Sequence, residues 1–333
     1  MSKITVKKII LCCVTLAAIA LFTIYFLKNR IMYTSNTISP TYSRSASAYD
    51  NNQLFYVKDN ILYFVGDTDD HVVRCVKNNW THTFAKLPVN YDNFVIVDDK
   101  TTVVRTMTDD IYLLVDGDLT ELWQGESLGY DGEKYLYFVT DGSLYSATLT
   151  EREPQKIISF DRLLGAYHDA IVYENEGCIY QLLYAEPNTP QLLAEDNPWS
   201  NDSPWLDYLY TSNYALCFGI ETLDMYTYET GEIKRLFDAN IVDENFTGMA
   251  VMAVAASDNE LYVSRQNTSM AYWPINNKKI NGTYKYDFVT GEWTKVDDNT
   301  YFELARFDER SMYGCIIGGI DDLFDPLKRI ELE

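Results

Sequence analysis

Short apolar and aromatic runs separated by polar turn residues occur along this chain, most clearly in KYLYFVTDGSLYSATL (Lys134–Leu149). In an extended chain, Leu136 and Phe138 would point to one side while Tyr137 and Val139 point to the other. The Asp-Gly pair in the middle of the stretch favours the positive φ angles of a two-residue hairpin turn. The pattern therefore predicts two antiparallel strands joined by a tight turn.

Looser versions of this phrase recur about every forty residues, a period typical of repeat folds such as propellers. They cover Asn60–Val76, Tyr112–Trp123, Asp169–Tyr184, Asn259–Gln266 and Tyr284–Val296. Each unit closes with a short run around one apolar residue, and these residues are Leu87, Leu122, Ile158, Leu193, Leu236, Val296 and Ile330. Their spacings are 35, 36, 35, 43, 60 and 34 residues.

Seven such units, each with room for four short strands, predict an all-β chain folded as a β-propeller. We expect seven blades, or six if a strand is exchanged where the ring closes. The 27 tyrosines and the aromatic content of 14% also favour strands over helices. No amphipathic helical pattern occurs between Asn52 and Glu333, which argues against helical solenoids and βαβ folds. A β-sandwich with irregular strands, or two of them, remains as the alternative.

Two of the repeats resemble a known motif. LYFVGD (Leu62–Asp67) and LYFVTD (Leu136–Asp141) resemble the YWTD repeat of low-density-lipoprotein-receptor-type propellers, and the looser repeats of TolB-like propellers in bacterial envelopes. Both stretches depart from that repeat by a Phe in place of Trp and by an extra residue before the Asp. The resemblance covers residues 53–333 as architecture, and it implies a bacterial propeller that binds or scaffolds rather than one particular chemistry.

The N-terminal segment has a different pattern. Residues 9–27 form an unbroken uncharged run, preceded by three lysines and followed by two basic residues. A helix of that length spans roughly 28 Å, close to the hydrocarbon core of a bilayer. We therefore expect an uncleaved transmembrane anchor at 9–27, with residues 1–8 cytoplasmic. The Ser/Thr-rich residues 28–52 would be a flexible stalk that carries an extracytoplasmic propeller over 53–333.

The net charge and the spacing of cysteines and histidines limit the partners and cofactors that we expect. The formal net charge is −22, and the first 30 residues contain no acidic residue, so the remainder is more acidic still. Such a body repels phosphate backbones, and we expect no nucleic acid partner. Four cysteines beyond the predicted anchor lie far apart, and the three histidines have no paired spacing. We therefore expect no metal site. The chain also has no Gly-rich phosphate loop, and we expect no cofactor.

One catalytic motif occurs in the chain. Gly125–Gly129 (GESLG) matches the GxSxG nucleophile pattern, which requires a strand before it and a helix after it. Here the motif falls in a link between two repeat units and is followed by a predicted strand, so we expect no nucleophile there. Acidic residues are abundant enough for a carboxylate pair in the central funnel, as in a hydrolase or lyase. The sequence does not select such a pair, and we expect no enzymatic activity.

Three insertions lengthen the connections between predicted strands: Glu195–Pro204, Ala239–Thr247 and Gln266–Lys279. In four-stranded up-and-down blades, the links between blades and the connections between second and third strands lie at one end. All three insertions should therefore rise from the same face.

Aromatic side chains beside amides and carboxylates suit sugar rings or extended peptides. The predicted ligand-binding residues are Trp199, Trp205, Tyr272 and Trp273. The alternative is that these loops fold down onto their own blades.

These observations predict a single-pass protein of the cell membrane whose propeller acts as a non-enzymatic binding or scaffold module. Its partner would be a cell-wall glycan or peptide, or an envelope protein. A propeller hydrolase or lyase is the competing class. A structural subunit of a membrane complex, with the transmembrane helix as its interaction surface, is a third hypothesis.

Overall fold

The fold is taken from a computed structural model of the chain. The structure describes residues 14–23, 32–34, 42–45, 55–58, 61–65, 72–77, 80–86, 91–106, 108–167, 169–199, 206–219, 222–238, 249–257, 259–267, 281–301, 303–308, 311–315 and 327–332. The statements that follow concern these residues.

The described strands form seven sheets. Three of them comprise β3 (Phe55–Lys58), β4 (Ile61–Val65), β5 (Val72–Lys77) and β6 (Trp80–Lys86); β7 (Tyr91–Ile96), β8 (Thr101–Thr106), β9 (Asp110–Val115) and β10 (Asp118–Gln124); β11 (Gly129–Tyr130), β12 (Tyr135–Thr140), β13 (Ser143–Thr148) and β14 (Gln155–Ser159). The next three comprise β15 (Arg162–Ala166), β16 (Ala170–Asn175), β17 (Cys178–Leu183) and β18 (Gln191–Ala194); β19 (Asp207–Tyr210), β20 (Tyr214–Phe218), β21 (Thr222–Thr227) and β22 (Glu232–Asp238); β23 (Met249–Ser257), β24 (Glu260–Asn267), β25 (Gly282–Tyr286) and β26 (Trp293–Asp297). The last contains β27 (Glu303–Asp308), β28 (Ser311–Cys315) and β29 (Leu327–Glu331).

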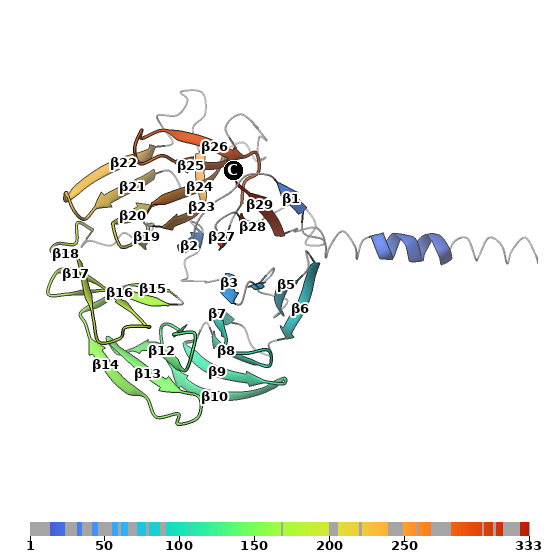
Figure 1. The fold of residues 1–333 in the computed structure, drawn as a ribbon, viewed down its shortest axis with the longest axis horizontal. Coiled ribbons are helices and arrows are strands. Elements are labelled where there is room, and N and C mark those ends of the chain that lie inside the picture. Colours follow the sequence, from blue (N-terminus) through green and yellow to red (C-terminus); the bar gives the residue numbers. More distant parts are fainter. Residues whose placement is uncertain are drawn as a thin grey trace, which may run out of the picture.

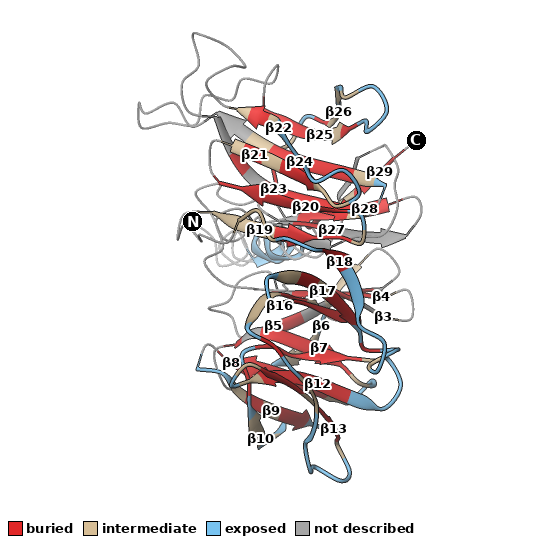
Figure 2. Cartoon of the chain, turned by 90° about the vertical axis from the view of Figure 1, so that its left-hand side faces the viewer, coloured by how far each residue is buried: buried red, intermediate tan, exposed pale blue. Residues whose placement is uncertain are grey.

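Consecutive sheets follow one another around a ring, and in six of them the first of the four consecutive strands lies toward the centre and the last toward the rim (Figure 1). This arrangement confirms the predicted all-β propeller, and the alternative of β-sandwiches is wrong. The landmark residues of the repeats lie in or directly after the last strand of a sheet, as Leu122 does in β10 and Ile158 in β14. Buried residues occupy the strands, and exposed ones lie mainly on the turns (Figure 2).

Strand β12 demonstrates why a run that is apolar on both sides of the strand suits this fold. Leu136 and Phe138 belong to the core shared with the preceding sheet β7–β10, as predicted for one side of the strand. Tyr137 and Val139 belong to the core shared with the following sheet β15–β18. A blade is covered on both faces by its neighbours, so both sets of side chains are apolar or aromatic.

The Asp-Gly turns form as predicted, because both residues adopt positive φ. Asp141 and Gly142 have φ values of 48° and 63° and join β12 to β13, whereas Asp116 and Gly117 join β9 to β10 with 49° and 95°. The expected hairpin around Thr290-Gly291 is different: six residues separate β25 from β26. There the Asp287 side chain accepts hydrogen bonds from two backbone N–H groups in the loop, at 2.7 and 3.0 Å, and stabilises a wider turn.

Two short strands come from the segment predicted to be a stalk. β1 (Met32–Thr34) pairs in parallel with β29, and it completes the sheet of β27, β28 and β29 as its fourth strand. β2 (Tyr42–Ser45) pairs antiparallel with β23 and becomes a fifth strand on the inner side of that sheet. Six sheets therefore contain four consecutive strands, and the seventh joins the two ends of the chain. The rest of residues 28–52 lies outside the described residues.

A helix covers residues 14–23, and its side chains are exposed. It falls inside the predicted anchor at 9–27, whose remaining residues are not described. Within the described part of the chain, the structure contains no helix both long and apolar enough to cross a membrane.

Candidate binding face

The strand order assigns each connection to one of two faces of the ring. The turn between β8 and β9 and the link from β10 to β11 lie together, since the Gly125 N–H donates to the Asp109 carbonyl at 2.8 Å. In the next sheet, the Phe160 N–H at the start of the link to β15 donates to the Gly142 carbonyl at 3.0 Å. We call the face that carries the inter-sheet links and the connections between second and third strands the link face.

The three insertions connect strands at this link face. The first joins β18 to β19 and the second joins β22 to β23, so both are links between sheets. The third joins β24 to β25, the second and third of the four consecutive strands in their sheet. The strand assignment behind the predicted binding face is therefore confirmed.

Of the four predicted ligand-binding residues, the structure describes Trp199, whereas Trp205, Tyr272 and Trp273 lie outside the described residues. Trp199 is half-buried and packs against Tyr208, with the ring centres 5.7 Å apart, and against Tyr226 at 5.9 Å. Its backbone N–H donates to Asn197 Oδ1 at 3.1 Å. Trp199 thus rests on the sheet β19–β22, and part of its side chain stays accessible.

A polar network lies beside Trp199. Glu174 Oε2 accepts hydrogen bonds from Arg162 Nη2 and from Asn197 Nδ2, each at 2.8 Å. Burial alone would raise the pKa of Glu174, but these two donors outweigh it and hold the pKa below its ordinary value. Glu174 is therefore an ionised, fixed acceptor at neutral pH, which is unsuited to proton donation.

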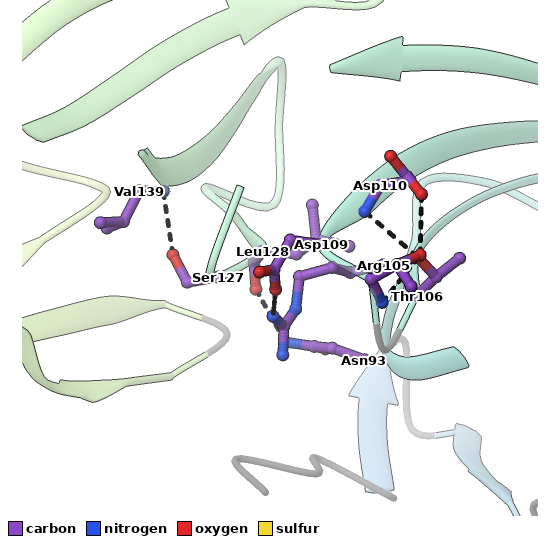
Figure 3. Close-up of polar contacts among 9 residues, drawn as sticks. Asn93, Arg105, Thr106, Asp109, Asp110, Ser127, Leu128 and Val139 are labelled. Carbon is purple, nitrogen blue, oxygen red and sulfur yellow. Dashed lines mark hydrogen bonds and ion pairs between the residues drawn. The ribbon is translucent and has the colours of Figure 1, made fainter. Parts of the chain in front are cut away.

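A second polar cluster connects the sheets β7–β10 and β11–β14 (Figure 3). Arg105 is buried and its Nη1 lies 2.7 Å from Asp109 Oδ1. Asn93, the register partner of Arg105 on β7, donates from Nδ2 to the Leu128 carbonyl at 3.2 Å. The Asp110 N–H donates to Thr106 Oγ1 at 3.2 Å. This cluster connects the region of the β8–β9 turn to the neighbouring link and stabilises the packing of the two sheets.

The GESLG segment lies in the same link. Ser127 is buried, and its Oγ accepts a hydrogen bond from the Val139 N–H at 3.1 Å (Figure 3). Gly129 lies against the Tyr184 ring so closely that an added Cβ would be 2.0 Å from a ring carbon. Both residues thus have packing roles, in agreement with the expectation that this motif is not a nucleophile elbow.

The described part of the link face shows no metal-site geometry, and three of its carboxylates lie beside basic side chains. The described residues contain no group of three potential metal ligands. Asp109 pairs with Arg105, Glu174 with Arg162, and Asp297 lies 3.9 Å from Lys328. The acidic turn at Asp67–Asp70, and both His71 and His168, lie outside the described residues.

Neither a protein-family model nor a curated protein sequence matches this chain. Solved structures with a similar fold include a computationally designed protein, Ika8, which is 15% identical with a TM-score of 0.44 over 83% of this chain and 82% of that one. PorZ, a bacterial surface component of the type-IX secretion system of Porphyromonas gingivalis, is 10% identical with a TM-score of 0.41 over 87% of this chain and 38% of that one.

A further similar structure is the dihydro-heme d1 dehydrogenase NirN, at 14% identity and a TM-score of 0.43 over 80% of this chain and 60% of that one. The chain thus spans less than two thirds of the length of PorZ and of NirN. These likenesses extend to the fold alone. The class of protein defined by the sheets and their connections is a β-propeller with its longest connections on one face.

Proposed function

We propose that this chain is a bacterial, membrane-anchored β-propeller that binds a cell-wall glycan or peptide, or an envelope protein, through its link face. The observation that supports the proposal is the strand topology: the ends of the strands that the three insertions connect belong to that face. Functional residues concentrate on loops that a rigid scaffold holds in place. The motif resemblance to YWTD and TolB-like propellers supports the same class of function.

The proposal includes an anchor at residues 9–27 and places the propeller outside the cytoplasm. Its support is the uncharged run between lysine-rich flanks, part of which forms the helix at 14–23. The closing strands β1 and β2 follow this segment within about 20 residues, so the propeller would lie close to the membrane surface.

Two described polar groups of the link face, Glu174 and Ser127, have structural partners, which favours binding over hydrolysis or lyase chemistry at their positions. Catalysis by carboxylates needs one acid with a raised pKa. Glu174 has a lowered pKa because Asn197 and Arg162 donate to it, and the Ser127 hydroxyl is occupied by the Val139 N–H. These groups hold the scaffold together and do not form an acid–base pair.

The test is co-sedimentation of the full chain, kept soluble in detergent, with isolated cell-wall sacculi. The variant carries Trp199→Ala, Trp205→Ala and Trp273→Ala. The matched control carries Phe288→Ala and Val289→Ala, two exposed apolar residues on the turn between β25 and β26, which lies on the opposite face.

We expect the parent and the control to sediment with the sacculi and the tryptophan variant to stay in solution. Circular dichroism of each protein verifies that the strands are intact. A parent that stays in solution contradicts wall binding, and equal losses in the variant and the control contradict the assignment to the link face.

A further inference from the structure

Arg265 lies on β24, immediately before the insertion Gln266–Lys279 that contains Tyr272 and Trp273. Its guanidinium carbon is 3.7 Å from the centre of the Tyr284 ring and 5.5 Å from the centre of the Phe237 ring. Tyr284 is on the adjacent strand β25, whereas Phe237 belongs to β22 of the neighbouring sheet. The guanidinium is therefore held by aromatic rings from two sheets at the edge of the link face.

The Arg265 side chain makes no hydrogen bond or ion pair with any described residue. Its Nε is buried without a partner, although the residue as a whole is half-buried. Two other described arginines with limited exposure are paired with acids: Arg105 with Asp109 at 2.7 Å and Arg162 with Glu174 at 2.8 Å. In a protein with 49 acidic residues and 27 basic ones, an arginine fixed by two rings without a carboxylate is unusual.

We propose that Arg265 binds a carboxylate group of the ligand, an inference that rests on the proposed binding function of the link face. The two ring contacts restrict the position of the guanidinium, and the burial of Nε leaves the two terminal nitrogens as its accessible end. That planar fork matches the two oxygens of a carboxylate in a bidentate pair. Because the arginine is already held in place, less side-chain entropy is lost on binding.

The surrounding charges favour a singly charged ligand group. Lys295 Nζ lies 6.0 Å from the same Tyr284 ring and pairs with Asp298 at 2.7 Å, so it adds only a partly neutralised charge. The net charge of −22 repels a doubly charged phosphate more strongly than a carboxylate. The ligand class is thus a carboxylate-bearing sugar or peptide.

The first experiment uses sodium acetate as the probe on the 15N-labelled full chain in detergent. The Nε–H resonance of Arg265 is assigned by its loss in Arg265→Lys. We expect acetate to shift this resonance saturably, inorganic phosphate to shift it less, and acetamide or sodium chloride at matched ionic strength to leave it in place. An unchanged resonance, or an equal shift with sodium chloride, overturns the proposal.

The second experiment compares native sacculi with sacculi whose carboxyl groups have been converted to amides. We expect the parent to sediment with native sacculi only, and Arg265→Gln to lose sedimentation. The matched control is Arg235→Gln. Arg235 lies on the outer strand β22 and is already paired with Asp224 of β21 and Asp238 of β22, so it is not available to a ligand carboxylate. Failure of the parent on native sacculi refutes the wall-binding function, while the acetate titration still decides the role of Arg265. Binding that survives amidation overturns the carboxylate assignment.

Discussion

At the scale of single residues, tyrosines fill much of the space between sheets, and their hydroxyl groups differ in their partners. The rings of Tyr137 and Tyr184 stack with centres 4.4 Å apart, and the Tyr137 hydroxyl donates to the Tyr184 carbonyl at 3.0 Å. The Tyr184 hydroxyl is buried and has no hydrogen-bond partner among the described residues. Burial raises the pKa of Tyr137 to about 12 and the pKa of Tyr184 well above its ordinary value.

The unpartnered hydroxyl gives a prediction. Tyr184→Phe should raise the free energy of unfolding by about 1 kcal/mol, since it removes a buried polar group that forms no hydrogen bond. Tyr137→Phe, which deletes a bond that is formed, should lower it by a similar amount. Urea denaturation of the two variants beside the parent measures both changes. A Tyr184→Phe variant as destabilised as Tyr137→Phe would refute this account of the hydroxyl.

At the scale of elements, the sheets were predictable and the closure of the ring was not. The short apolar-aromatic run of β12 and the Asp-Gly turns are local signals, because such runs fit a strand buried on both faces and few residues tolerate positive φ. β1 and β2 have no such signal: their Ser/Thr-rich segment is ordered by pairing with β29 and β23, which lie more than 200 residues away. The structure of β1 and β2 depends on pairing with distant strands, and the local sequence pattern does not predict that pairing.

In the candidate site, too, some features were predictable from the sequence and others depend on contacts between sheets. The link face follows from counting strands, so the sequence was sufficient to locate the insertions. The contact of Arg265 with Phe237 crosses from one sheet to the next, and β24 by itself reads as an ordinary strand. The packing of Trp199 on Tyr208 likewise depends on the neighbouring sheet.

The closure by β1 and β2 gives a prediction at this scale. A chain shortened to begin at residue 49 loses both strands, whereas one that begins at residue 31 keeps them. The shorter chain should lose on the order of 3 kcal/mol of unfolding free energy, since several ladder hydrogen bonds at about 1 kcal/mol each disappear. Thermal unfolding followed by circular dichroism compares the two chains. Equal midpoints would show that the N-terminal strands do not close the ring.

At the scale of the whole molecule, the ring presents two faces with different connections. The opposite face carries short turns such as those over 149–154 and 287–292, and the link face carries the three insertions, Trp199 and Arg265. The acidic charge disfavours polyanionic partners, and in our proposal Arg265 offers one fixed cation for a single carboxylate. We therefore propose that ligand binding takes place on one side of the ring.

The most direct test of that assignment is hydrogen–deuterium exchange of the full chain in detergent, with and without cell-wall fragments solubilised by a muramidase. The account predicts slower exchange in link-face segments, such as residues 125–128 and 195–199, with no change in the turns over 149–154 and 287–292. Slower exchange confined to those opposite turns, or no change in any segment, would contradict it.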